Sequence, residues 1–170
     1  MKKIFTPQIT LAVILILAAG FSRLIHIAPN IAAVGAMALF GGAYFQNKRL
    51  AFAIPLITMM LTDIIIGFHR VMIPVYLCFV FTVFLGTLIS GRKNVFVIAS
   101  ASVTSSVIFF LVTNLPFWYG SSYPWNFAGA MESYTAAIPF FQNSLAGDLA
   151  FNALLFGSFE FAKRRIPASA

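Results

Sequence analysis

The chain alternates between long apolar runs and short polar or basic breaks. A helix needs about 20 mostly apolar residues to cross a bilayer. Six runs approach that length, over residues 8–22, 30–45, 50–68, 71–90, 94–114 and 134–161. These runs are too long and too continuously apolar for the alternating strands of a membrane barrel. The pattern therefore predicts an all-α membrane protein in which one domain, residues 1–170, crosses the bilayer six times.

Two of the runs allow a second interpretation. The run over residues 30–45 is rich in Gly and Ala, which suits either a tightly packed helix or a re-entrant segment. The first run follows Lys2 and Lys3 and contains the small residues Ala18, Ala19 and Gly20, the order found in a cleaved signal peptide. Its apolar stretch continues through the would-be cleavage point, which favours a transmembrane helix instead.

Basic residues lie almost entirely in alternate breaks between the runs. If the N-terminus is cytoplasmic, nine of the 11 Lys and Arg residues face the cytoplasm and only Arg23 and Arg70 lie outside. The nine are Lys2, Lys3, Lys48, Arg49, Arg92, Lys93, Lys163, Arg164 and Arg165. Because cytoplasmic loops are enriched in Lys and Arg, this asymmetry predicts that both termini are cytoplasmic. The location expected from it is a cytoplasmic membrane.

Composition supports the bilayer as the main partner. Hydrophobic residues make up 61% and charged residues 9%, whereas a typical soluble domain has about 25% charged residues. The net charge of +7 comes from short clusters between apolar runs, not from one basic face. That placement excludes nucleic acid as the expected partner.

Two carboxylates fall inside predicted spans, where ionisable groups are costly and often functional. Asp63 lies in the outer third of the third run, so we expect it nearer a substrate cavity. Asp148 lies near the middle of the sixth run, so we expect its loss to affect stability more than binding. The alternative for both is a buried, hydrogen-bonded residue that fixes helix packing.

Cys78 is the lone cysteine, which excludes an intrachain disulfide. It is the eighth residue of the fourth run, about 10 Å from the outer end of that helix. A membrane cysteine can be simply a small hydrophobe, but its thiolate is also a soft metal ligand. His26 and His69 fall at the same outer face, where a solvated surface role and a ligand role both remain open.

An outer loop, residues 115–133, carries Trp118, Tyr119, Tyr123 and Trp125. These rings suit an interfacial aromatic belt or a lid that stacks on a flat ligand. A Ser- and Thr-rich stretch, residues 100–106, is expected to hydrogen-bond neighbouring helices. The sequence contains no Walker A motif, so the chain does not bind ATP by that route, and it lacks the HExxH and GxSxG enzyme signatures.

Several segments together resemble a family of small bacterial membrane proteins similar to the substrate-binding (S) components of energy-coupling-factor vitamin transporters. They are FSRLIH (21–26), PN (29–30), GAMALFGGAYF (35–45), PL (55–56), LTD (61–63), GFH (67–69), FFLVTN (109–114) with Trp118, IPFF (138–141) and GD (147–148). The resemblance covers nearly the whole chain. It implies an S-component-like helical bundle without an intrinsic cofactor.

Within that group the chain looks most like the solitary vitamin B12 transporters, and Cys78 carries this likeness. The resemblance implies that Cys78 coordinates the cobalt of cobalamin, and that it could remove the cyanide ligand of cyanocobalamin. S components that dock to a shared energising module usually carry an AxxxA pattern on the first helix; here Ala32 and Ala36 have that spacing in the second run instead. Two alternatives stay open, a transporter of another small micronutrient and a non-transporting structural membrane protein.

Overall fold

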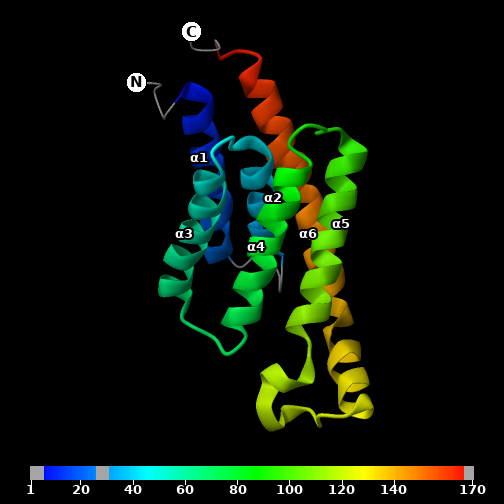
Figure 1. Cartoon of the computed structure of the whole chain (residues 1–170). Helices are drawn as coiled ribbons and strands as arrows, with labels where there is room; N and C mark the ends of the chain where they lie inside the picture. The colour runs from blue at the N-terminus through cyan, green and yellow to red at the C-terminus, as the bar shows by residue number, and fades with distance from the viewer. Residues whose placement is uncertain (1–5, 26–30, 167–170) are drawn as a thin grey trace.

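A computed structural model describes residues 6–25 and 31–166 of the chain. Over these residues the chain folds into six α-helices and two 3-10 helices, with no strand (Figure 1). The elements are α1 (Pro7–Phe21), η1 (Ser22–Leu24), α2 (Val34–Tyr44), α3 (Lys48–Ile66), α4 (Met72–Leu88), α5 (Val95–Thr113), η2 (Pro116–Ser122) and α6 (Phe127–Lys163). The predicted all-α class is therefore confirmed, and each predicted apolar run contains most of one helix.

Four helices begin where a polar side chain satisfies a free backbone N–H group. The Thr6 hydroxyl accepts from the N–H of Ile9 at the start of α1. The side chains of Asn47, Asn94 and Asn126 do the same for α3, α5 and α6, each over 2.9 Å. Such N-caps stabilise a helix start by about 1 kcal/mol, so the polar breaks in the sequence set where these helices begin.

One end of the bundle, here called the basic end, collects most of the described positive charge. Figure 1 shows the start of α1, the end of α6, and the α2–α3 and α4–α5 connections together at this end. These segments carry Lys48, Arg49, Arg92, Lys93, Lys163, Arg164 and Arg165. Arg23 and Arg70 lie at the opposite end, in η1 and in the α3–α4 connection.

Helix α2 lies at the centre of the bundle and packs against α1, α3, α4 and α6. Its small residues permit this position, because α2 and α4 cross with their backbones in contact. A Cβ atom built on Gly42 would lie 2.9 Å from the Cα of Gly86, and one built on Gly86 would lie 2.9 Å from the Cα of Gly42. Small residues at a membrane helix crossing allow this close approach. The Gly- and Ala-rich run is therefore a tightly packed helix.

Helix lengths differ more than the apolar runs suggested. Among the described residues, three segments are long and apolar enough to cross a membrane, Pro7–Leu24, Lys48–Ile66 and Val95–Thr113. Helix α2 has 11 residues and α4 has 17. Helix α6 has 37 residues and starts at Phe127, so the loop predicted over residues 115–133 is largely helical. That prediction was wrong because the loop was bounded by apolarity, whereas the Asn126 cap starts the helix in a polar stretch.

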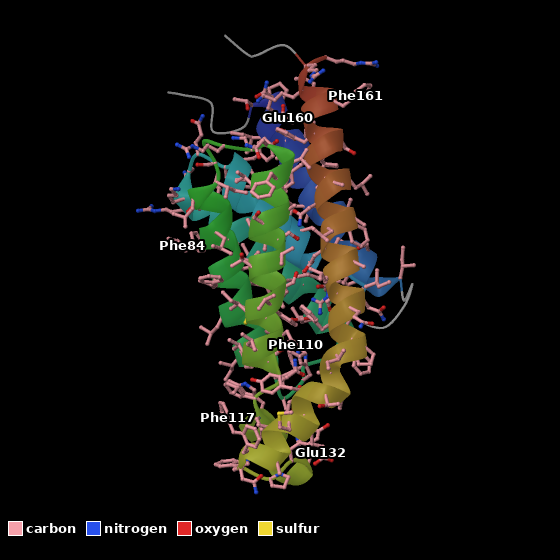
Figure 2. The ribbon with its side chains drawn as sticks, turned by 90° about the vertical axis from the view of Figure 1, so that its right-hand side faces the viewer. Phe84, Phe110, Phe117, Glu132, Glu160 and Phe161 are labelled. Atoms are coloured by element: carbon pink, nitrogen blue, oxygen red, sulfur yellow. The ribbon has the colours of Figure 1, made fainter. Side chains whose placement is uncertain are left out.

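The extra turns of α6 extend the bundle beyond the other helices. Figure 2 shows Glu160 and Phe161 at the basic end and Phe117 and Glu132 at the far tip. At about 1.5 Å per residue, 37 residues span about 55 Å, well over the about 30 Å of a hydrocarbon core. The first turns of α6 and η2 therefore project beyond the end opposite the basic end (Figure 1).

Candidate ligand cavity

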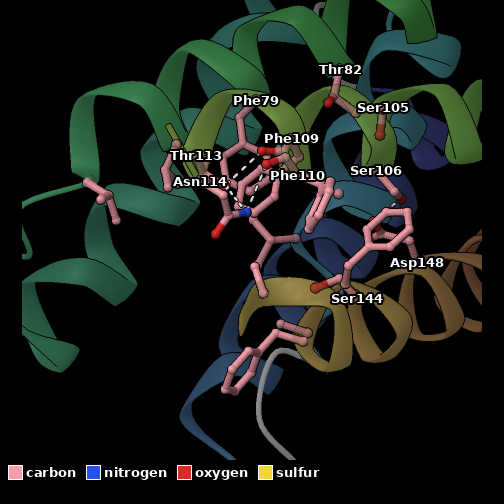
Figure 3. Close-up of a pocket in the computed structure, with 18 of the residues that line it drawn as sticks. Phe79, Thr82, Ser105, Ser106, Phe109, Phe110, Thr113, Asn114, Ser144 and Asp148 are labelled. Carbon is pink, nitrogen blue, oxygen red and sulfur yellow. Dashed lines mark hydrogen bonds between the residues drawn. The ribbon is translucent and has the colours of Figure 1, made fainter. Parts of the chain in front are cut away.

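A cavity of about 530 Å³ lies in the half of the bundle away from the basic end. Its walls come from the start of α2, the first half of α4, the second half of α5 and the first half of α6 (Figure 3). Five phenylalanines supply much of the apolar surface, namely Phe79, Phe109, Phe110, Phe140 and Phe141. Hydroxyl groups of Thr82, Ser105, Ser106, Thr113, Ser133 and Ser144 also line it. The site thus combines apolar and aromatic side chains with many polar ones.

Asp148 supplies the carboxylate of this cavity. Its Oδ2 atom accepts a hydrogen bond from the Ser106 hydroxyl over 2.8 Å, which joins α6 to α5 (Figure 3). The backbone N–H of Ala36, in the first turn of α2, also donates to the carboxylate. Gly35 makes room for it, since a Cβ there would lie 2.8 Å from Oδ2. Asp148 therefore sits at the positive end of the α2 dipole, a position that favours negative charge.

A second polar layer lies behind Asp148. The side-chain amide of Asn152 donates to the Ser102 hydroxyl over 3.0 Å and to the Asp148 carbonyl oxygen over 2.8 Å. Both Ser102 and Asn152 are buried. Ser102 and Ser106 therefore link α5 to α6, which confirms the expectation that the Ser- and Thr-rich stretch bonds to a neighbouring helix.

The opposite end of the cavity is formed by Arg23, which is anchored by a buried acid. Arg23 Nη1 lies 2.8 Å from Asp63 Oδ1 and donates to the Thr62 hydroxyl over 3.0 Å. The Tyr76 hydroxyl donates to Asp63 Oδ2 over 2.8 Å. Asp63 is fully buried and does not line the cavity, whereas Arg23 does. Asp63, which lies outside the cavity lining, therefore neutralises the positive charge of Arg23.

Helix η2 and the residue after it contribute Tyr119 and Tyr123 to the lining of the cavity, and the two rings meet edge to face at 5.7 Å. The Tyr119 hydroxyl donates to the Thr113 carbonyl oxygen over 3.0 Å. Burial, with a smaller contribution from Tyr123, raises the pKa of Tyr119, so its phenol stays protonated and able to donate. Gly120 follows with φ of 63° and ψ of −120°, a conformation that favours glycine.

The residues predicted as ligand contacts divide into two groups. His69, Tyr119 and Tyr123 line the cavity, but Asp63, Cys78, Trp118 and Trp125 do not. Trp118 instead donates its indole N–H to the Val112 carbonyl oxygen over 2.7 Å, and Trp125 is 75% exposed. His26 lies outside the described residues. The ligand roles of these residues stay predictions, since no ligand contact tests them.

Cys78 is 4% exposed and lies on the inner side of α4. Its neighbours Val75, Phe79 and Thr82 line the cavity, and their spacing puts them on the same helix face as Cys78. The thiol itself is covered. Within the described part of the chain, no three His, Cys, Asp or Glu residues gather closely enough to hold a metal ion.

The two interior acids lie differently with respect to the cavity than their positions in the sequence suggested, and their roles stay predictions. Asp148, expected to be a packing residue, faces the cavity, while Asp63, expected nearer the substrate, is enclosed behind Arg23. Sequence reasoning assigned Ser106 to helix bonding and not to a ligand site, and it gave no ligand role to the five phenylalanines. The phenylalanines gave no signal, because chain position alone cannot tell a lipid-facing ring from a cavity-facing one in an apolar helix.

The model of one protein family matches residues 3–169, and its description is "Family of unknown function (DUF6580)". The chain belongs to this family, which covers nearly its whole length. No curated protein and no solved structure matches the chain. Its function is therefore argued from the cavity.

Proposed function

We propose that this member of the DUF6580 family is a multi-pass protein of the bacterial inner membrane that binds a small organic nutrient and serves in its uptake. The cavity carries this proposal. Its volume of about 530 Å³ falls within the about 300–1,000 Å³ of small-molecule sites. Apolar and aromatic side chains beside polar groups that can orient a ligand are also found in such sites.

The proposed topology has six transmembrane helices and both chain ends in the cytoplasm. The collection of Lys and Arg at the basic end supports this orientation. The cavity then lies in the outer half of the protein, with Arg23, His69 and Tyr119 near its outer side. A nutrient arriving from outside would meet this half first, as uptake requires.

The volume of the cavity suits a small organic molecule. For a corrinoid, Cys78 would need to become uncovered to reach the cobalt. One observation keeps cobalamin as a second candidate, namely that Cys78 shares its helix face with the cavity residues Val75, Phe79 and Thr82. Binding of cobalamin through sulfur would require the thiol of Cys78 to become accessible from the cavity.

The proposal is tested by filling the cavity and looking for a lost ligand. Ala136 lines the cavity and Ala146 is an exposed residue of the same helix that does not line it. Protein purified in mild detergent would be denatured, and the released small molecules identified by mass spectrometry. We expect a molecule that is released by the unmodified protein and by Ala146→Trp, and lost in Ala136→Trp.

Two results would contradict the proposal. One is that no small molecule is released by any of the three proteins, even after growth in nutrient-rich medium. The other is that Ala136→Trp releases the same molecules as the unmodified protein. Either result would favour a structural membrane protein with no ligand. A recovered molecule would then be tested as a radiolabelled substrate for uptake into cells.

A further inference from the structure

The two interior acids differ in whether a basic residue neutralises them. Asp63 has the guanidinium of Arg23 at 2.8 Å. For Asp148, no Lys or Arg side chain of residues 6–25 or 31–166 lies within ion-pair distance. Its partners are the neutral donors Ser106 and the Ala36 N–H. An unpaired carboxylate inside a membrane protein is costly, and such residues mark ligand or ion sites.

The carboxylate also has unused capacity to accept hydrogen bonds. A carboxylate offers about four lone-pair sites, and the described protein groups supply two donors to Asp148. Asp148 faces the cavity, so a ligand can reach the remaining sites. A positively charged hydrogen-bond donor on the ligand would both occupy the free acceptor sites of the Asp148 carboxylate and neutralise its negative charge.

The aromatic walls favour the same kind of ligand. The rings of Phe110 and Phe141 lie with centroids 4.7 Å apart, and those of Phe79 and Phe109 lie 5.9 Å apart. Aromatic faces attract organic cations through their quadrupoles. Arg23 is the only Lys or Arg among the described lining residues, and Asp63 neutralises it. Asp148 therefore dominates the charge of the inner wall.

From this arrangement we infer that the cavity selects a small organic cation, with its ammonium or equivalent N–H group against Asp148 and its apolar body among the phenylalanines. The inference rests on the proposed binding function and names the substrate class. The competing explanation is that Asp148 acts only as a cap on the first turn of α2. A cap needs a hydrogen-bond acceptor but not a charge. The two explanations therefore predict different ligand preferences for the variant Asp148→Asn, in which an amide replaces the carboxylate.

The probes are three molecules with the same ring and different charge: 1-naphthylmethylammonium, 1-naphthalenemethanol and 1-naphthoate. Their affinities would be measured on the purified full chain by the ligand-induced rise in the midpoint of thermal unfolding. We expect the ammonium to bind about tenfold or more tightly than the alcohol, the scale of a buried charge pair. The anion should bind more weakly than the alcohol.

Two variants of α6, each with an amide in place of a carboxylate, test whether the preference for the ammonium over the alcohol depends on Asp148. Asp148→Asn keeps an acceptor for the Ala36 N–H but removes the charge, so the preference for the ammonium over the alcohol should disappear. Glu160→Gln is the matched control, because Glu160 pairs with Tyr44 at the basic end, outside the cavity. This control should keep the full preference.

A second measurement uses the unmodified protein, in case Asp148→Asn does not fold. Dicyclohexylcarbodiimide labels carboxyl groups in apolar surroundings, and peptide mass spectrometry would locate the label. The ammonium should protect Asp148 from labelling and the alcohol should not. The inference is overturned if the alcohol binds as tightly as the ammonium, if the preference survives Asp148→Asn, or if the ammonium gives no protection. Binding by none of the three probes would instead count against the cavity as a binding site, and so against the proposed function as well.

Discussion

Arg23 Nη1 and Asp63 Oδ1 lie 2.8 Å apart and form an ion pair between η1 and α3. The acid is fully buried and the base is 16% exposed. The Tyr76 hydroxyl donates to the other carboxylate oxygen, Oδ2, over 2.8 Å. This pair determines the charge at one side of the cavity, because it lets Arg23 line the wall without adding net charge.

Breaking this pair should destabilise the protein. Asp63→Asn leaves the Arg23 guanidinium poorly solvated and without its counter-charge, a change that costs about 3–5 kcal/mol when the charge is buried. We expect a lower midpoint of thermal unfolding, and partial recovery in the double variant Arg23→Gln/Asp63→Asn, where no unpaired charge remains. An Asp63→Asn protein as stable as the unmodified one would show that the pair contributes nothing to stability.

The crossing of α2 and α4 predicts a strong dependence on glycine. At Gly42 or Gly86 a methyl group would overlap the backbone of the other helix, so Gly42→Ala and Gly86→Ala should each lower the free energy of unfolding by about 1–3 kcal/mol. Gly157→Ala is the control, because a Cβ there meets nothing within 4 Å. It should be neutral or stabilise α6 by up to about 1 kcal/mol. Equal effects at the three positions would argue against the close crossing.

The topology can be tested with reporters at the chain ends. Both ends should report a cytoplasmic location, because the opposite orientation would place nine of the 11 basic residues outside. Alkaline phosphatase, active outside, and green fluorescent protein, fluorescent inside, give opposite signals when fused in turn to each end. A C-terminus that reads as outside while the N-terminus reads as inside would exclude six crossings.

Cobalt coordination makes a separate prediction for Cys78. If cobalamin binds through sulfur, Cys78→Ser replaces a soft ligand with a hard one and should abolish the absorption bands of thiolate-bound cobalamin and any decyanation of cyanocobalamin. Side-chain volume barely changes, so the variant should fold. Visible spectra of both proteins purified from cells fed cobalamin provide the measurement. Identical spectra would show that the buried Cys78 is only a packing residue.

Much of the architecture was already determined by the sequence. Apolar runs broken by polar residues predicted the helices, since burying a backbone in an apolar solvent requires internal hydrogen bonds. The Asn residues that start α3, α5 and α6 act locally, through contacts two or three residues away. The basic clusters, likewise, are properties of the chain and not of its packing.

Only the tertiary structure decided which side chains face the cavity. The rotation of a helix cannot be read from its sequence when polar residues are not gathered on one face, as in α5 and α6. Rotation is decided by contacts between distant segments, such as Gly42 against Gly86 and Gly35 beside Asp148. These contacts enclose Asp63 behind Arg23, cover Cys78 and turn Asp148 toward the cavity. The sequence thus indicated which residues were unusual, and packing between helices determined which of them a ligand can reach.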